Sequence, residues 1–142
     1  MALDRALLER AQPASLTILR VVTAYLFMLH GSAKLFGMPH QSVFDNLQLM
    51  SIIGLAGILE FFGGLLILVG LFARPAAFVL CGFMAVAYFM AHASQGNPLL
   101  PILNQGDLAV LFCFVFLYFV FAGAGPWSMD ALLARRRGSP RA

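Results

Sequence analysis

The segment that decides the fold reads L16-T-I-L-R-V-V-T-A-Y-L-F-M-L-H-G-S-A-K-L-F36. It is mostly apolar, and it is long enough to cross a bilayer core of about 30 Å as an α-helix. Because lipid offers the backbone no hydrogen bonds, a helix is the conformation we expect. Three ionisable side chains interrupt the segment: Arg20, His30 and Lys34. Such groups are costly inside a bilayer, so each of them marks a candidate functional position.

The composition of the whole chain is that of a membrane protein. Of the 142 residues, 61% are hydrophobic and 11% are charged, and the mean hydropathy is +0.89. A soluble protein has about 45–50% apolar and about 25% charged residues. The length fits one domain. Basic residues outnumber acidic ones by nine to six, but they gather at the chain ends and in one short loop, which indicates membrane topology rather than nucleic-acid binding.

Four apolar runs have the length of membrane spans. They cover Leu16–Phe36, Ile52–Phe72, Pro75–Ala93 and Asp107–Ala124. The connections between them are short, which favours antiparallel neighbours. We therefore predict an all-α integral membrane protein, an antiparallel four-transmembrane-helix bundle that occupies residues 16–124.

The basic residues predict the orientation of these spans. The arginines fall at the termini, in the second loop or near the same end of a span, whereas Lys34 falls at the opposite side. By the positive-inside rule, both termini are cytoplasmic. Residues 1–15 resemble no secretory signal and predict an amphipathic cytoplasmic helix that Pro13 ends. Residues 125–142 predict a basic cytoplasmic tail with a short surface helix.

The polar residues of the spans fall at similar depths. At a rise of about 1.5 Å per residue, His30 lies about 9 Å and Glu60 about 12 Å below the outer ends of their helices. Lys34 shares a stripe of the first helix with His30 and Arg20. Glu60 is predicted to face the bundle interior, with His30 or Lys34 as its partner. Three further polar residues belong to the same outer half: His92, Asn104 and Asp107.

Each of these residues also has a purely structural interpretation. Lys34 can extend to the lipid headgroups, and Arg20 can be a cytoplasmic anchor. His92 can be an interfacial histidine. Asn104 or Asp107 can cap the last helix. Glu60 has no route to the headgroups, so it is either half of a buried ion pair that fixes helix register or a proton-handling group beside a histidine.

The sequence lacks the usual signatures of metal and cofactor sites. Cys81 and Cys113 form neither a CxxC motif nor a set with metal-ligand spacing. We interpret them as two small buried apolar residues rather than as a thiol–disulfide enzyme site. The chain carries no haem, iron–sulfur or flavin motif, and no metal site is predicted.

Four motifs follow one another along the chain. They read H30-G-x-x-K34-L-F-G, then E60-x-x-G63-G64-x-L-x-x-x-G70-L-x-x-R74, then N104-x-G-D107, then G125-P-W-S-x-D130. In this order the chain resembles the DoxX family. The resemblance implies a four-helix protein of the bacterial inner membrane, and named members of the family are linked to membrane redox work. Family members include the small subunit of a thiosulfate:quinone oxidoreductase and a partner of superoxide dismutase and a sulfurtransferase. Asp107 departs from the glutamate that many members carry.

Three functions remain open from the sequence. In the first, the protein is a redox subunit in which Glu60 and His30 exchange protons with a quinone, and Lys34, Arg20, His92, Asn104 and Asp107 help to bind it. Electrons would then come from a substrate or from a partner, such as a soluble redox enzyme or a second membrane subunit. In the second, it is a non-catalytic membrane anchor for a soluble oxidoreductase. In the third, a homo-oligomer forms a small-solute or proton pathway.

Overall fold

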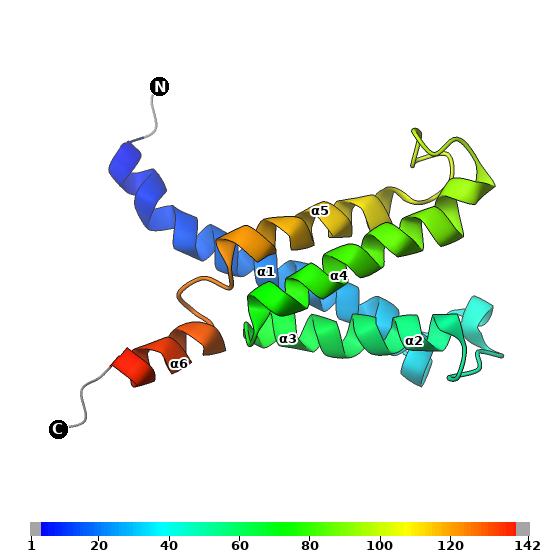
Figure 1. The fold of residues 1–142 in the computed structure, drawn as a ribbon, viewed down its shortest axis with the longest axis horizontal. Coiled ribbons are helices and arrows are strands. Elements are labelled where there is room, and N and C mark those ends of the chain that lie inside the picture. Colours follow the sequence, from blue (N-terminus) through cyan, green and yellow to red (C-terminus); the bar gives the residue numbers. More distant parts are fainter. Residues whose placement is uncertain (1–3, 139–142) are drawn as a thin grey trace. The chain divides into compact units, whose positions relative to one another are not determined.

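The computed structural model describes residues 4–138, and every regular element in that range is a helix (Figure 1). The elements are α1 (Arg5–Phe36), η1 (Ser42–Phe44), α2 (Ile52–Ile58), η2 (Leu59–Gly63), α3 (Gly64–Val69), α4 (Ala73–Ala87), η3 (Tyr88–His92), η4 (Ala93–Gln95), α5 (Asp107–Ala122) and α6 (Met129–Gly138). Three helical runs are long and apolar enough to cross a membrane, namely Arg5–Phe36, Ile52–Val69 and Ala73–Gln95. The apolar α5 is shorter. The all-α class is thus confirmed.

The chain divides into two compact units. Within the described range, the first unit comprises residues 4–73 and 124–138, and the second comprises residues 74–123. The first unit therefore holds α1, the continuous α2–η2–α3 run and α6. The second holds nearly all of α4, together with η3, η4 and α5.

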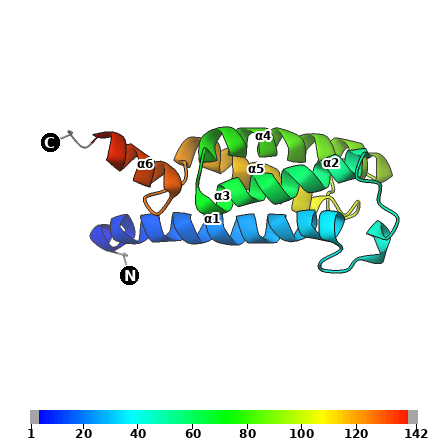
Figure 2. The same ribbon diagram turned by 90° about the horizontal axis from the view of Figure 1, so that it is seen from below.

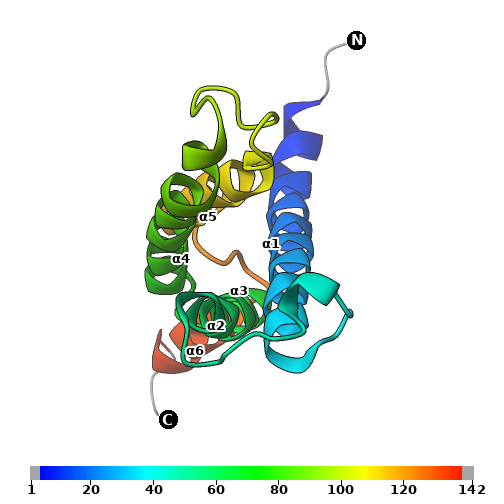
Figure 3. The same cartoon turned by 90° about the vertical axis from the view of Figure 1, so that its right-hand side faces the viewer.

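In the first unit, α1 packs along α2, η2 and α3 (Figures 2 and 3). Glycine makes this approach close. A Cβ placed on Gly31 of α1 would lie 2.5 Å from the backbone nitrogen of Phe61, and one on Gly64 would lie 2.6 Å from Cγ of Met28. Since side chains at both positions would clash, these glycines let the backbones approach as small residues do between membrane helices. The contacts run in opposite order along the two partners, so α1 and the α2–α3 run are antiparallel.

The first helix differs from the prediction at its beginning. It starts at Arg5, where the Asp4 carboxylate accepts a hydrogen bond from the Ala6 amide at 3.1 Å. Pro13 was predicted to end a separate amphipathic helix, but it lies inside α1, and that prediction is wrong. The ring removes one backbone donor, and the helix continues while Thr17 Oγ1 donates to the Pro13 carbonyl at 2.9 Å.

The C-terminal tail contains the predicted short helix, α6, which carries the basic residues of its last turn, Arg135–Arg137. The predictions for residues 1–15 and 125–142 extend to residues 1–3 and 139–142, which lie outside the described part of the chain.

In the second unit, α4 and α5 are antiparallel. At one end of the pair, the Arg74 guanidinium donates to the carbonyls of Val120 and Phe121, at 2.7 and 2.8 Å. At the other end, a Cβ placed on Gly106 would clash with the ring of Tyr88. Because the last carbonyls of α5 have no helical partners, the hydrogen bonds from Arg74 satisfy two of them.

Candidate functional site

The most deeply placed ion pair of the described residues joins α1 to η2. Lys34 Nζ lies 2.5 Å from Glu60 Oε1 and 2.6 Å from Glu60 Oε2, so one ammonium contacts both carboxylate oxygens. The two side chains are only 14% and 7% exposed. The sequence left two partners open for Glu60, and Lys34 is the one that bonds it.

Local helix geometry explains why these two side chains meet. A Cβ placed on Gly57 would lie 3.0 Å from Cβ of Lys34, so this glycine leaves space for the lysine stem. One turn further on, Glu60 lies in η2, which is a π-helical turn. Such a turn widens an α-helix locally and is frequent at functional sites. The close approach and the widened turn together place the carboxylate opposite the ammonium.

Aromatic residues lie near the Lys34–Glu60 pair on the same elements and in the loop that follows α1. The Lys34 ammonium lies 5.8 Å from the ring centre of Phe44, within the range of a cation–π contact. On the neighbouring turns, Phe36 and Phe61 meet edge to face with centroids 5.1 Å apart. Phe61 also contacts Phe62 at 5.4 Å. The Lys34 ammonium therefore has an aromatic neighbour, and Glu60 is followed in the chain by two phenylalanines that contact each other.

His30 lies one helical turn before Lys34 on α1. It is half-buried and close enough to Lys34 for their charges to interact. A titratable imidazole thus stands beside the pair, as the four-residue spacing predicted.

Arg20 lies in a different environment. Its position on α1 is about 21 Å along the helix from Lys34. The residue is 2% exposed, and its guanidinium donates to the carbonyls of Ile67 at 2.7 Å, Leu68 at 2.5 Å and Trp127 at 2.8 Å. Arg20 thus closes the C-terminal end of α3 and holds the chain that leads into α6. It was predicted to bind quinone, and the structure separates it from the pair.

The same region fixes the tail through Asp130. Its carboxylate accepts hydrogen bonds from the backbone amides of Phe72 at 2.8 Å and Ala73 at 2.9 Å, while its own amide donates to the Gly70 carbonyl at 2.9 Å. Gly70 has φ +67°, and a Cβ there would lie 2.5 Å from Cβ of Ser128. We call this set, Arg20, Gly70, Trp127, Ser128 and Asp130, the tail junction.

Two of the three remaining predicted residues meet in the second unit. His92 Nδ1 lies 3.2 Å from the Asn104 carbonyl oxygen. The Asn104 amide donates to the hydroxyl of Tyr88 at 3.3 Å, and that hydroxyl donates to the Pro98 carbonyl at 2.7 Å. The sequence analysis missed Tyr88. These contacts order the chain between η4 and α5.

The sequence offered Asn104 or Asp107 as the residue whose side chain caps α5, and neither occupies the cap position. The cap position is Gly106, which has no side chain to form a cap, and the Asn104 side chain instead accepts a hydrogen bond from the Gly106 amide at 3.0 Å. Asp107 lies in the first turn of α5 and is exposed, where its charge is favourable to the helix dipole.

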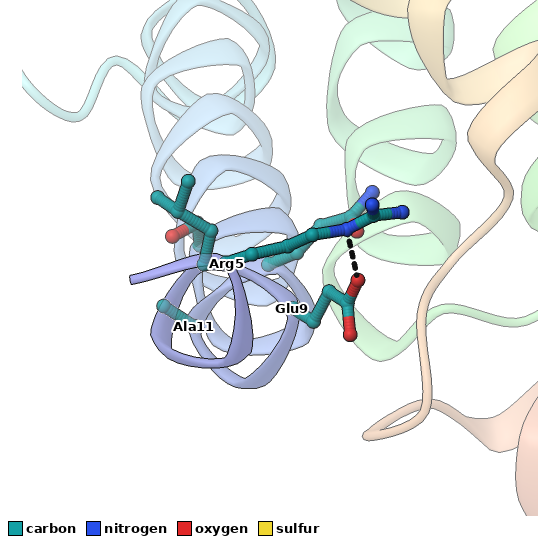
Figure 4. A pocket seen from close by; sticks show the side chains of 6 residues that line it. Arg5, Glu9 and Ala11 are labelled. Atoms are coloured by element: carbon teal, nitrogen blue, oxygen red, sulfur yellow. Dashed lines mark hydrogen bonds and ion pairs between the residues drawn. The ribbon is translucent and has the colours of Figure 1, made fainter. Parts of the chain in front are cut away.

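An open pocket lies at the beginning of α1, far from the Lys34–Glu60 pair (Figure 4). Its lining residues are all on α1: Arg5, Leu8, Glu9, Ala11, Gln12 and Ser15. Arg5 and Glu9 form an exposed ion pair of 3.1 Å there. A hollow formed along one exposed helix does not enclose a ligand, so we place the candidate site at the buried pair. Within residues 4–138, no group of three His, Cys, Asp or Glu side chains is suited to hold a metal ion.

The comparison with protein families decides the classification. The model of the DoxX family matches residues 15–93, which is more than half of the chain. The chain belongs to the DoxX family. Its relatives include an uncharacterized protein of Haemophilus influenzae that is 45% identical over 87% of this chain and 93% of the relative. Another is the inner membrane protein YqjF of Escherichia coli, 25% identical over 91% of this chain and 99% of that protein. No solved structure matches.

These findings assign this DoxX protein to a membrane. Its apolar helices, its family and its Escherichia coli relative together support a location in a bacterial inner membrane, in contact with the lipid bilayer. The structure also gives the recognised motifs a physical meaning. The first two motifs contribute Lys34 and Glu60 to one ion pair, whereas Gly70 and Asp130 of the second and fourth motifs meet in the tail junction.

Proposed function

We propose that this DoxX protein is a membrane component of a redox system and that it binds a quinone at the Lys34–Glu60 pair. The observation that carries the proposal is a buried ammonium–carboxylate pair, with aromatic residues near it and a histidine one turn away. A buried ionisable pair inside a membrane helix is a functional candidate by default.

The side chains at the pair fit a quinone, which supplies two-electron, two-proton chemistry when it is bound. Lysine has three N–H donors. Two of them serve the oxygens of Glu60, and the third is suited to donate to a quinone carbonyl. The rings of Phe36 and Phe61 offer apolar surface for the flat ring system. Arg20 takes no part, because its guanidinium already binds backbone carbonyls.

Lys34, Glu60 and His30 each have a distinct role in this proposal. Lys34 orients the ligand and stabilises negative charge on its oxygen. Glu60 holds or releases a proton at a carboxylate oxygen. His30, one turn away, exchanges protons with the ligand through its imidazole nitrogens. The electrons come from a soluble redox enzyme or a second membrane subunit, since the sequence carries no haem, iron–sulfur or flavin motif.

The proposed architecture for this role is an antiparallel four-helix bundle in residues 16–124, with both termini in the cytoplasm. It is supported by the antiparallel order inside each unit and by the position of the arginines. Residues 1–15 and 125–142 then flank the bundle on the cytoplasmic side. Labelling of a cysteine placed at Ser139 should occur only when the cytoplasmic face is accessible, and labelling from the other face would reverse the orientation.

A second candidate function is that of a membrane anchor for a soluble oxidoreductase. It is favoured by the tail, where the exposed Trp127 and the basic last turn of α6 offer a docking surface. In that case the Lys34–Glu60 pair would only fix helix register.

Mass spectrometry of the protein purified gently in lipid separates the two candidates. We expect a quinone to accompany the unaltered protein and to be lost from the Glu60→Gln and His30→Ala variants. The matched control is Glu9→Gln, which changes an exposed glutamate of α1 and should leave the quinone bound. A soluble partner retained equally by all four forms, with no quinone in any of them, would favour the anchor.

A further inference from the structure

Two cysteines from different helices face each other in the second unit. Cys81 of α4 and Cys113 of α5 are both reduced, and their sulfur atoms lie 3.7 Å apart. The Cys113 thiol also lies 3.5 Å from the carbonyl oxygen of Cys81, to which it donates. From the sequence these residues were interpreted as buried apolar positions. The structure corrects this, because both are partly exposed and they contact each other.

Both thiols lie well inside apolar helices. Cys81 is about 12 Å from the first residue of α4, and Cys113 is about 9 Å from the first residue of α5. In a bilayer with a hydrocarbon core of about 30 Å, these depths place the sulfurs away from both water phases. Water-soluble thiol reagents and thiol proteins therefore have poor access to them, whereas a lipid-soluble oxidant does not face that barrier.

The surface beside the pair is open to such a molecule. A Cβ placed on Gly82, next to Cys81, would have no described atom within 4 Å. Phe78, one turn before Gly82, is 70% exposed, and Phe114, which directly follows Cys113, is 63% exposed. The two sulfurs thus lie beside an apolar surface that a flat lipid-soluble molecule can contact.

We propose that Cys81 and Cys113 are a redox-active dithiol that a lipid-soluble quinone oxidises to a disulfide. Two S–H bonds break and one S–S bond forms, while the two electrons and two protons pass to the quinone and convert it to a quinol. A lipid-soluble dithiol that enters the bilayer reverses the change by thiol–disulfide exchange. This inference rests on the proposed function in one respect, because it takes its oxidant, a quinone, from there.

The geometry requires a small movement for this step. A disulfide has an S–S length of about 2.05 Å, so the sulfurs have to approach each other by about 1.7 Å. Rotation of the cysteine side chains, with a slight shift of α4 against α5, is a change of this size. The alternative is that the two cysteines only serve as small packing residues, together with Ala77 and Ala85 on the same stripe of α4.

The test is performed on the full-length protein in lipid nanodiscs. The protein is treated with a short-chain quinone or with a chemical disulfide-forming oxidant, then unfolded, and its remaining thiols are counted by maleimide labelling. We expect both oxidants to remove both thiols from the unaltered protein, with a mass loss of two hydrogen atoms, and dithiothreitol added after unfolding to restore them. The Cys81→Ser and Cys113→Ser variants should each keep their remaining thiol.

A displaced pair provides the matched control. Combining Cys113→Ala with Leu117→Cys moves one thiol by four residues, about 6 Å along α5, and this pair should stay reduced in quinone. Failure of both oxidants to close the native pair would overturn the inference. So would closure by the chemical oxidant but not by quinone. If quinone copurifies but the thiols do not react, the dithiol proposal fails and the proposed quinone site at the Lys34–Glu60 pair is retained. If the thiols are oxidised but no quinone copurifies, the dithiol proposal is retained and the proposed quinone site fails.

Discussion

Arg20 is a buried and Lys34 a largely buried cation of α1, and they differ in what they face. Lys34 meets a carboxylate, in a pair whose members are 14% and 7% exposed. Arg20 meets three backbone carbonyls of Ile67, Leu68 and Trp127. A carboxylate can gain or lose a proton, whereas a backbone carbonyl has one charge state. The partner of such a cation therefore decides whether the position can take part in proton chemistry or only stabilises the fold.

The largest effect is expected from breaking the Lys34–Glu60 pair on one side. Lys34→Met leaves a buried carboxylate without its partner, and removing one member of a buried pair costs about 3–5 kcal/mol of unfolding free energy. Adding Glu60→Leu removes the stranded charge and should restore most of the loss. Thermal unfolding in lipid nanodiscs measures both. A double variant no more stable than Lys34→Met would mean that the two side chains are not coupled.

A somewhat smaller loss is expected at Arg20. Arg20→Met removes hydrogen bonds from a charged donor to three carbonyls, and we expect the unfolding free energy to fall by about 3 kcal/mol. No second side-chain substitution should rescue it, because the acceptors belong to the backbone. Arg20→Lys should retain part of the stability. If Arg20→Met leaves the unfolding free energy in the same nanodiscs unchanged, the tail junction does not stabilise the fold.

The tail side of the junction predicts a more modest change. Asp130→Ala removes the acceptor for the amides of Phe72 and Ala73, a loss comparable to that of a helix cap, about 1 kcal/mol. Protease cleavage near α6 should become faster, since the tail is less firmly held. Asp107→Asn, at an exposed acid in the first turn of α5, is the control and should leave the rate of tail cleavage as it is.

The smallest effect belongs to the exposed pair at the beginning of α1. Arg5 and Glu9 are 92% and 67% exposed, and exposed ion pairs contribute little. Glu9→Gln should change the unfolding free energy by no more than about 0.5 kcal/mol. A larger loss would indicate that exposure is a poor guide to the weight of charged pairs in this protein.

The sequence predicts the helices and limits the partner of Glu60 to His30 or Lys34, because both follow from local patterns. Apolar length marks the spans, and matching depths bring Glu60 to His30 and Lys34. The sequence analysis missed features that depend on distant backbone. Arg20 shares a helical stripe with Lys34, yet its guanidinium donates to backbone carbonyls of α3 and of the tail. The hydropathy pattern does not predict these hydrogen bonds. Pro13 was predicted to end a helix, although α1 continues through it.

The cysteine pair shows the same limit. Cys81 and Cys113 are far apart in the sequence and lack a CxxC spacing, so only the packing of α4 against α5 brings their sulfurs together. A partial signal was present for the tail junction, because Gly70 and Asp130 both belong to the recognised motifs. Their meeting at the start of α4 could not be read from spacing alone.

The most direct test of the central claim is the affinity for a short-chain quinone, measured in nanodiscs for four forms of the protein. If the quinone binds at the Lys34–Glu60 pair, Glu60→Gln and Lys34→Gln should each weaken binding by roughly 10-fold or more, the loss expected for a hydrogen bond to a charged group. Arg20→Lys, at the other buried cation of α1, should bind the quinone as tightly as the unaltered protein. Equal affinity in all four forms would contradict the assignment of the site.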